Sequence, residues 1–253
     1  MTPVPASIDG VWALVPVKRL GAGKQRLRTA LDTQAAREQL ILAMLEDVLR
    51  SISASIGPAR LGGCAVVTDD ARAASIGRRH GADIVSDAGA WVAPGGAPCP
   101  SSMPDDADGY SRAVANAIAL LARCGACAAL VLPADLPLIT PMEIERLVAA
   151  HRDGRRCAIV AARDGRGTNA VLLRLPASIA LAFDGASFGP HLDAARLAGL
   201  DPLVLQLPGI AFDIDLPRDL GALAEHPQAR GTMAGRLARR LAAATSTGTG
   251  PTR

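Results

Sequence analysis

A basic, glycine-containing turn follows the first long apolar run of the sequence. Residues 15–27 read VPVKRLGAGKQRL and place Lys18, Arg19, Lys24 and Arg26 around Gly-Ala-Gly. Such a turn is suited to holding an anion. It is not a P-loop, because residue 18 is not glycine and residue 25 has no hydroxyl, and residue 26 breaks the dinucleotide fingerprint. The alternative is a basic loop that only faces water.

Three aspartates are expected at the same edge of the predicted sheet as this turn. Asp135 ends a buried apolar run in PADLP, and Asp213 and Asp215 stand two positions apart in FDIDLP. On a strand, residues two apart point to the same face, where paired carboxylates would need a divalent cation to neutralise them. Carboxylates and substrate phosphates commonly hold Mg²⁺. The alternative for Asp215 is a cap on a helix that begins near Pro217.

Cations for phosphates beside carboxylates for a metal suit phosphoryl or nucleotidyl transfer, which depends on positioning and charge stabilisation. We therefore expect Mg²⁺ as the cofactor, held by the three aspartates. No catalytic histidine or cysteine is needed, and the four histidines show no metal-binding spacing. Cys124 and Cys127 lie after a predicted helix and before a strand, the reverse of a redox motif, so incidental thiols are expected.

Composition narrows the class of protein. The 253 residues fit one large α/β domain or two small ones, and 49% hydrophobic residues allow a sizeable core. A net charge of +3 with 2% aromatic residues does not indicate nucleic-acid binding. No apolar run approaches the roughly 20 residues that span a bilayer, and the N-terminus does not resemble a signal peptide. We expect a cytoplasmic protein with no nucleic-acid or membrane partner.

Strands and helices alternate through the first half of the chain. Apolar runs predict strands and helical periodicity predicts the helices between them. The predicted strands are 11–17, 64–70, 82–87 and 127–137, and the predicted helices begin near Thr33, Ala71, Ser111 and the Thr140-Pro141-x-Glu143 capping box. Residues 88–109 are rich in Pro, Gly and Ser and are expected to form a loop. The alternation implies a parallel sheet with right-handed crossovers.

The second half has more closely spaced strands, which predicts a mixed sheet. The strands are expected in RCAIVAAR and NAVLLRLP and then in PLVLQLPG and AFDID. From about residue 229 a basic amphipathic segment gives way to small polar residues, which is typical of a frayed surface helix. We expect one α/β domain over residues 11–225, and a tail over 226–253 that is basic and helical at first and then flexible.

Taken in order, these motifs resemble the guanylyltransferases of the CofC family, which act in biosynthesis of the deazaflavin coenzyme F-420. The matching pieces, between about residues 12 and 222, are VKRLGAGKQRL, VVTDD, GADIVSD, PADLPLI, GTNAVLL, SFGPHL and FDIDLPRDL. The resemblance implies a Rossmann-like nucleotidyltransferase fold (MobA-like, GT-A-like), a mixed, mostly parallel sheet with flanking helices. It also implies transfer of GMP from GTP to a small phosphorylated carboxylic acid, with release of pyrophosphate.

The resemblance further implies roles for individual residues. By the family pattern, the residues near GTP are Lys18, Lys24, Arg26 and Asp69, those that hold Mg²⁺ are Asp135, Asp213 and Asp215, and those that hold the acid are Thr168, Asp184, Gly185 and Ser187. The aspartates that hold Mg²⁺ and Lys18 would be the catalytic groups. The acid's own phosphate is an anionic nucleophile, so it needs only to be brought in line with the α-phosphate and no general base is required.

The sequence departs from the family pattern at several places. FDGAS at 183–187 replaces Phe-Gly-Pro-Gly-Ser, so Asp184 places a carboxylate near an anionic substrate. DGYSRA at 108–113 stands where the family prefers Gly-Leu-Asn-x-Ala, and Leu216 replaces a threonine that would cap a helix. The Ala- and Arg-rich composition indicates a GC-rich bacterium and favours 3-phosphoglycerate or phosphoenolpyruvate over 2-phospholactate as the acid.

Two other functions stay open on the sequence. A molybdenum-cofactor or sugar nucleotidyltransferase would share the fold, although the acid-site loop 183–191 argues against it. A nucleotide-binding module without turnover would fit Asp184 and the altered segment 108–113. The sequence leaves open whether the chain forms a homodimer. A guanylylated product is expected to pass to a downstream transferase of the pathway.

Overall fold

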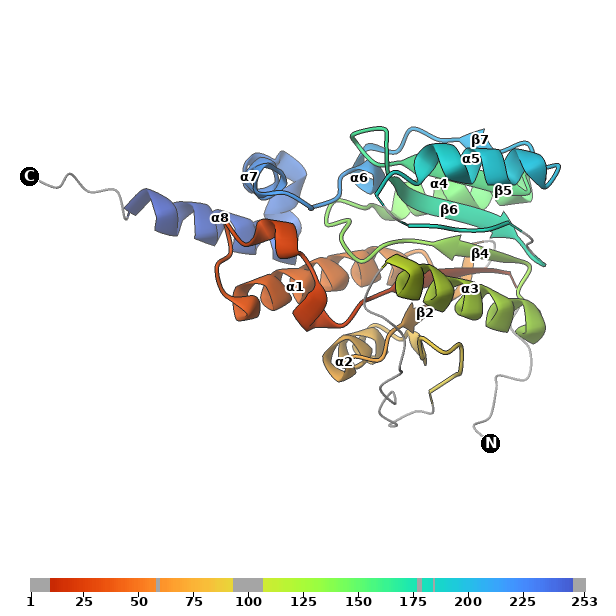
Figure 1. Ribbon diagram of the computed structural model, residues 1–253, viewed down its shortest axis with the longest axis horizontal. Helices are drawn as coiled ribbons and strands as arrows, with labels where there is room; N and C mark the ends of the chain where they lie inside the picture. The colour runs from red at the N-terminus through yellow and green to blue at the C-terminus, as the bar shows by residue number, and fades with distance from the viewer. Residues whose placement is uncertain (1–9, 58–59, 93–106, 177–178, 184, 248–253) are drawn as a thin grey trace, which may run out of the picture.

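The protein is built around a seven-stranded sheet in the order β3-β2-β1-β4-β6-β5-β7 (Figure 1). The computed structural model describes residues 10–57, 60–92, 107–176, 179–183 and 185–247. The strands are β1 (Val11–Pro16), β2 (Leu61–Val67), β3 (Asp83–Val85), β4 (Ala128–Val131), β5 (Cys157–Ala161), β6 (Thr168–Arg174) and β7 (Leu203–Val204). β6 is antiparallel to both its neighbours, and the other adjacent pairs are parallel. The predicted mixed, mostly parallel α/β sheet is confirmed.

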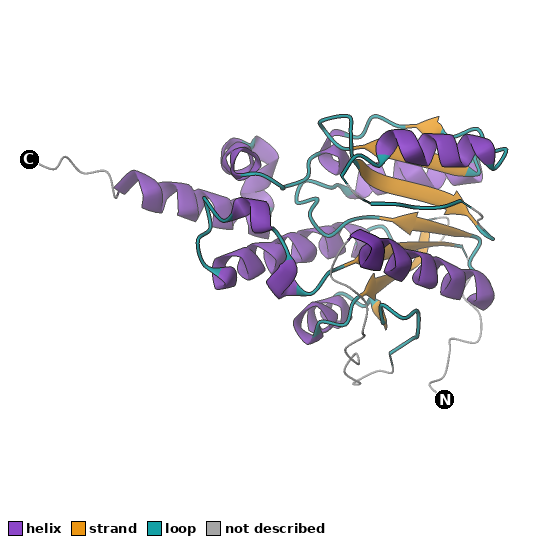
Figure 2. Cartoon of the chain, in the orientation of Figure 1, coloured by secondary structure: helices purple, strands orange, loops and turns teal. Residues whose placement is uncertain are grey.

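Helices cover both faces of this sheet (Figure 2). They are α1 (Gln34–Ser53), α2 (Ala71–Arg79), α3 (Ala107–Cys124), α4 (Pro141–Arg152), α5 (Phe188–Leu197), α6 (Pro208–Ala211), α7 (Pro217–Glu225) and α8 (Met233–Thr247). Residues of α3 and α5 belong to the core on one face, and residues of the other helices to the core on the opposite face. The buried strand β1 serves both cores, because Ala13 and Val15 join one and Trp12 and Leu14 join the other.

Two helices begin where local capping predicts. The Thr33 side chain accepts the N–H of Ala36 at 3.2 Å at the start of α1. At the start of α4, the Thr140 side chain accepts the N–H of Glu143 at 3.3 Å, and the Glu143 carboxylate accepts the N–H of Thr140 at 3.0 Å. The Glu143 carboxylate also accepts the N–H of Gly209 at 2.7 Å, which ties α4 to α6.

The segment AFDID is not a strand, so that prediction is wrong. β7 is only two residues long, and Asp213 and Asp215 lie in the loop between α6 and α7. Pro208 has no N–H for a ladder and a φ suited to a first helical turn, so the chain enters α6 instead. A Cβ on Gly209 would lie 2.3 Å from the backbone oxygen of Leu138, so this close approach requires glycine.

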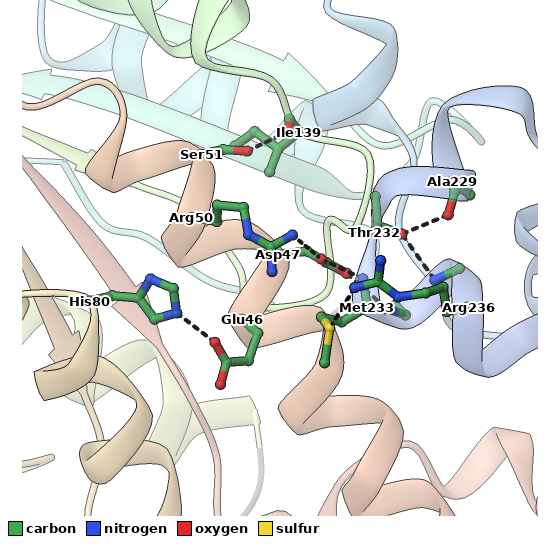
Figure 3. Close-up of polar contacts among 12 residues, drawn as sticks. Glu46, Asp47, Arg50, Ser51, His80, Ile139, Ala229, Thr232, Met233 and Arg236 are labelled. Atoms are coloured by element: carbon green, nitrogen blue, oxygen red, sulfur yellow. Dashed lines mark hydrogen bonds and ion pairs between the residues drawn. The ribbon is translucent and has the colours of Figure 1, made fainter.

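The C-terminal helix packs on the body of the protein. α8 follows the turn η3 (Pro227–Gly231) and contacts α1 and α7. The carboxylate of Asp47, in α1, accepts the N–H groups of Met233 at 2.7 Å and Ala234 at 2.8 Å (Figure 3). Ala234 and Ala238 are buried, and the last turns extend away from the body. The predicted helix of the tail is present, and its first half packs on the body instead of fraying.

Three further expectations concern the loop 88–109, the cysteines and helices that could span a membrane. In the predicted loop 88–109, residues 93–106 lie outside the described residues, and 107–109 belong to α3. Cys124 and Cys127 are free thiols. Over the described ranges, no helix combines the length and apolar character needed to cross a bilayer.

Candidate active site

A cavity of about 520 Å³ lies where the parallel strands β1 and β4 end. Three kinds of predicted site residue line it. They are the basic residues Lys18, Lys24 and Arg26, the acidic residues Asp135, Asp213 and Asp215, and the expected acid-binding residues Thr168, Gly185 and Ser187. Thr168 reaches this edge because β6 runs in the opposite direction and begins where its neighbours end. In open α/β sheets, ligands bind at this edge.

Lys24 holds a distinctive place in the basic turn. The turn consists of two short helical turns, η1 (Leu20–Ala22) and η2 (Gln25–Leu27). Between them, Lys24 has φ 53° and ψ 38°, and it is the only non-glycine residue with positive φ in the described part of the chain. This conformation costs a residue with a side chain about 1–2 kcal/mol, and such strain concentrates at functional sites.

The ammonium group of Lys24 bridges two aspartates from distant parts of the chain. Nζ donates to Asp135 Oδ2 at 2.5 Å and to Asp215 Oδ1 at 2.7 Å. Burial alone would lower the pKa of Lys24, but the two carboxylates outweigh burial and raise it, so Lys24 is a cation. In turn, the charge of Lys24 lowers the pKa of Asp215, against the effect of burial.

Asp213 has a neutral hydrogen-bond partner. Asn169 Nδ2 donates to Asp213 Oδ1 at 3.2 Å and to the backbone oxygen of Ile210 at 3.0 Å. Burial, together with the nearby charges of Asp135 and Asp215, raises the pKa of Asp213 to about 6, and the Asn169 hydrogen bond offsets this only in part. A cation placed among these carboxylates would favour their ionised forms.

Backbone contacts hold the loop that carries Asp213 and Asp215. The buried Asp219 carboxylate, in the first turn of α7, accepts the N–H of Asp215 at 3.1 Å and of Leu216 at 2.7 Å. Arg163 donates to the same carboxylate at 2.5 Å, and its backbone N–H binds the oxygen of Ala211 at 2.8 Å. Asp219 therefore supplies the carboxylate half of a capping box, which binds the N–H of residue 216, while Leu216 supplies no side-chain acceptor. Asp215 is not the cap of α7.

The acidic side chains suit a hard divalent cation only in combination with a ligand. Oxygen donors from Asp135, Asp213 and Asp215 line one cavity, and oxygen is the donor that Mg²⁺ prefers. Within the described ranges, however, no three His, Cys, Asp or Glu side chains converge closely enough to enclose a metal. Mg²⁺ commonly takes one or two carboxylates together with phosphate oxygens and water. The residues present fit that arrangement, not a preformed three-aspartate cage.

The expected acid-binding residues form a buried part of the wall. Thr168 is 5% exposed and Ser187 is 2% exposed, and both line the cavity with Gly185. Thr168 Oγ1 lies 3.0 Å from Nδ1 of His191, which is buried in α5. Asp184, also expected here, lies outside the described residues.

The altered segment 108–113 supports the acid-binding loop. Ser111 Oγ accepts the N–H of Phe183 at 3.1 Å. The Tyr110 ring packs edge-on against Phe183 with 5.5 Å between ring centroids, and Lys18 Nζ lies 5.3 Å from the centroid of the Tyr110 ring. Burial and then the charge of Asp135 raise the pKa of Tyr110, which keeps its hydroxyl protonated.

Asp69 is placed differently from the other predicted GTP-binding residues. It is not among the residues that line this cavity. Its carboxylate accepts the N–H of Asp87 at 3.1 Å, joining the turns that follow β2 and β3. A contact between Asp69 and GTP stays a prediction.

Some residues of the site were missed by sequence reasoning. Asn169 and His191 lie inside the motifs GTNAVLL and SFGPHL, so their positions offered a signal. Asp219 stands three residues after Leu216, where a side chain can reach back to a helix start. Arg163 carried no local signal, because its partner Asp219 lies 56 positions away.

Comparison with known proteins adds a family. The sequence model of the protein family described as "Guanylyl transferase CofC like" matches residues 107–251. The phosphoenolpyruvate guanylyltransferase of Rubrobacter xylanophilus is 35% identical over 214 residues, which cover 84% of this chain and 93% of that protein. The phosphoenolpyruvate guanylyltransferase of Sphaerobacter thermophilus is also 35% identical over 214 residues, covering 85% and 92%.

Solved structures share the fold at low sequence identity. A protein described as a nucleotide-diphospho-sugar transferase, from Desulfovibrio desulfuricans G20, has a TM-score of 0.66 and 17% identity, with 95% of this chain and 98% of that chain covered. A nucleotidyl transferase from Methanothermobacter has a TM-score of 0.51 and 16% identity, with 85% and 96% covered. These likenesses confirm the predicted nucleotidyltransferase-type fold.

Proposed function

Because the chain belongs to the CofC family of guanylyltransferases, we propose that it transfers the guanylyl group of GTP to a small phosphorylated carboxylic acid. A phosphate oxygen of the acid bonds to the α-phosphorus of GTP, and the bond between that phosphorus and the bridging oxygen breaks to release pyrophosphate. The observation that carries the proposal is one cavity lined by basic residues, by aspartates and by the buried hydroxyl residues Thr168 and Ser187.

The basic residues would bind the triphosphate. Lys18, Lys24 and Arg26 offset the repulsion between GTP and the anionic acid, and they stabilise charge on the departing pyrophosphate. Lys24 contacts Asp135 and Asp215 in the free protein, and because an ammonium group has three N–H donors, a phosphate oxygen could join these two partners or replace one of them. Asp69 would contribute from the neighbouring turn.

The aspartates would hold Mg²⁺ together with phosphate oxygens. Asp135, Asp213 and Asp215 supply the protein oxygens, and the residues around them keep those oxygens in place. When bound, the ion neutralises charge on the phosphates. Asp213 supports this assignment because burial and two neighbouring carboxylates raise its pKa to about 6, a situation that a cation relieves.

The acid would bind at Thr168, Asp184, Gly185 and Ser187. Hydroxyl and backbone donors there suit a carboxylate or phosphate. Both relatives described above are named for phosphoenolpyruvate, which supports that acid ahead of 2-phospholactate. The case for 3-phosphoglycerate rests on the composition of the sequence. The product contains a new phosphoanhydride bond, so it suits onward transfer by a downstream transferase of coenzyme F-420 biosynthesis in the cytoplasm.

A test of every pair of nucleotide and acceptor checks the proposal. The nucleotides are GTP, CTP and UTP, and the acceptors are phosphoenolpyruvate, 3-phosphoglycerate, 2-phospholactate and a sugar phosphate. Pyrophosphate release by the purified protein with Mg²⁺ is measured for each pair. We expect release with GTP and a phosphorylated C3 acid. Release with a sugar phosphate instead would favour a sugar nucleotidyltransferase. Tight GTP binding without release under any condition would favour a binding module.

A further inference from the structure

His191 is a buried imidazole at the acid side of the cavity, and its two nitrogens have different partners. The residue is 1% exposed and lies in the first turn of α5, where its backbone N–H donates to the backbone oxygen of Ser187 at 2.9 Å. The backbone N–H of Ala182 donates to Nε2 at 3.0 Å. Nδ1 lies 3.0 Å from Thr168 Oγ1.

These contacts determine where the proton of the neutral ring sits. A backbone N–H can only donate, so Nε2 must carry the lone pair that accepts from Ala182. The proton is therefore on Nδ1, and Nδ1–H donates to Thr168 Oγ1. The donor role of Nδ1 thus follows from the acceptor role of Nε2.

The same reasoning extends to the threonine hydroxyl. A hydroxyl has one proton to donate and two lone pairs to accept with. With one lone pair used by His191, the Thr168 proton is available to a group in the cavity, which Thr168 lines. We propose that His191 is a positioning residue that presents Thr168 as a hydrogen-bond donor to an anionic oxygen of the acid. This inference rests on the proposed function, because it takes the acid to bind at Thr168.

His191 also connects Thr168 to the acid-binding loop. Its ring packs against Phe183 with 5.0 Å between ring centroids, and its bond to Ala182 holds the residue before Phe183. After the loop, the backbone N–H of Phe188 donates to the backbone oxygen of Arg166 at 2.9 Å. One imidazole thus contacts both Thr168 and residues 182–183, where the acid-binding loop begins.

Two substitutions separate orientation of Thr168 from support of the loop. In His191→Asn, the amide nitrogen can occupy the place of Nδ1 and still donate to Thr168, while the acceptor for Ala182 is lost. In His191→Gln, the amide oxygen can occupy the place of Nε2 and still accept from Ala182, while the donor to Thr168 is lost. The pair therefore removes one contact of the ring at a time.

The kinetic experiment uses GTP, Mg²⁺ and phosphoenolpyruvate. We expect His191→Gln to raise the KM for the acid about tenfold, the effect of one hydrogen bond to a charged group, with the KM for GTP unchanged. His191→Asn should raise the acid KM clearly less. In a Thr168→Val background the advantage of the Asn variant over the Gln variant should vanish, because no hydroxyl is left to orient. A purely structural role would leave that advantage in place.

A spectroscopic measurement keeps the inference testable if a variant folds poorly. In the wild-type protein with ¹⁵N-labelled histidine, long-range proton–nitrogen correlations should place the His191 proton on Nδ1. A proton on Nε2 would overturn the inference, as would a larger acid KM for the Asn variant than for the Gln variant. If the wild-type protein uses no phosphorylated acid, the proposed function fails instead, and the role of Thr168 with it.

Discussion

Lys24 Nζ lies 2.7 Å from Asp215 Oδ1, although the two residues are 191 positions apart in the chain. The same ammonium group contacts Asp135 at 2.5 Å. A basic turn that could have been a solvated loop is thereby joined to the carboxylates proposed to hold a metal. In the free protein Lys24 offsets only part of the charge of these two carboxylates, and the proposed phosphate and metal would join the same network.

Replacing Lys24 with alanine should impair the use of GTP strongly. A charged contact in a partly dry site contributes about 1.5–3 kcal/mol, so we expect kcat/KM for GTP to fall by roughly tenfold to more than a hundredfold. Steady-state kinetics with GTP as the varied substrate measures this. Arg28→Ala, at an exposed position of the same segment, should have little effect. Unchanged kcat and KM for GTP in Lys24→Ala would mean that the turn is only a solvated surface.

Asp213→Asn should reduce turnover by orders of magnitude while making the free protein more stable near neutral pH. The amide oxygen can still accept from Asn169, and a partly buried charge beside Asp135 and Asp215 is removed. The gain should be on the order of 1–2 kcal/mol after allowance for solvent screening. Near-normal Mg²⁺-dependent activity in this variant would contradict the proposed metal site.

The pH dependence of that stability difference has a definite sign. The pKa of Asp213 in the folded protein is raised from 3.8 to about 6, so the folded state binds more protons than the unfolded state between these values. The stabilising contribution of the protonated Asp213 carboxyl is present below the unfolded pKa and is lost as the pH rises through the folded pKa. In thermal unfolding without metal, the Tm of Asp213→Asn should therefore be higher than that of wild type at about pH 7.5. The difference in Tm should shrink towards about pH 4.

Ser187→Ala should affect the acid and not the nucleotide. Ser187 is buried in the cavity wall, and a hydrogen bond to a charged group contributes about 1.5–3 kcal/mol. Use of the acid should fall roughly tenfold to a hundredfold, with GTP binding retained. Calorimetry with each ligand separates the two effects, and Ser53→Ala, whose hydroxyl binds the His80 oxygen, is a matched control. Weakened GTP binding with normal use of the acid would mean that the two halves of the site are reversed.

Asp219→Ala should loosen the loop that carries Asp215. Two backbone N–H groups and Arg163 would lose their common acceptor. We expect a loss of stability of about 1–3 kcal/mol, together with a higher Mg²⁺ concentration for half-maximal turnover. Arg218→Ala changes an exposed neighbour, 78% exposed at its side chain, and should leave the Mg²⁺ titration as in wild type. An unchanged Mg²⁺ requirement in Asp219→Ala would show that the loop keeps its shape without this support.

Asp47→Ala should weaken the attachment of α8 without affecting the cavity. The N–H groups of Met233 and Ala234 would lose their acceptor at a buried helix start, which costs about 1–2 kcal/mol. Urea unfolding gives the loss of stability, and hydrogen exchange should rise selectively in the first turns of α8. Arg50→Ala removes only an exposed partner of Asp47 and should change either measurement little. Equal exchange in both variants would contradict the capping role of Asp47.

The features that depend on near neighbours were determined by the sequence itself. The caps at Thr33 and Thr140 involve residues three positions away, and the buried strand β1 follows from a continuous apolar run. The predicted sheet places Lys24 and Asp135 at one edge, because the carboxyl ends of neighbouring parallel strands meet there. These choices need only local geometry and the direction of each strand.

The exact arrangement of the site was decided only by the tertiary structure. Asp213 and Asp215 lie in a loop because Pro208 begins a helix whose Gly209 binds Glu143, 66 positions away. The proton of His191 is placed by the backbone of Ala182, and its use depends on Thr168 in another element. Such contacts join segments far apart in the chain, and no local spacing encodes them. They form because burying each polar group requires a partner, and only the folded chain brings that partner within reach.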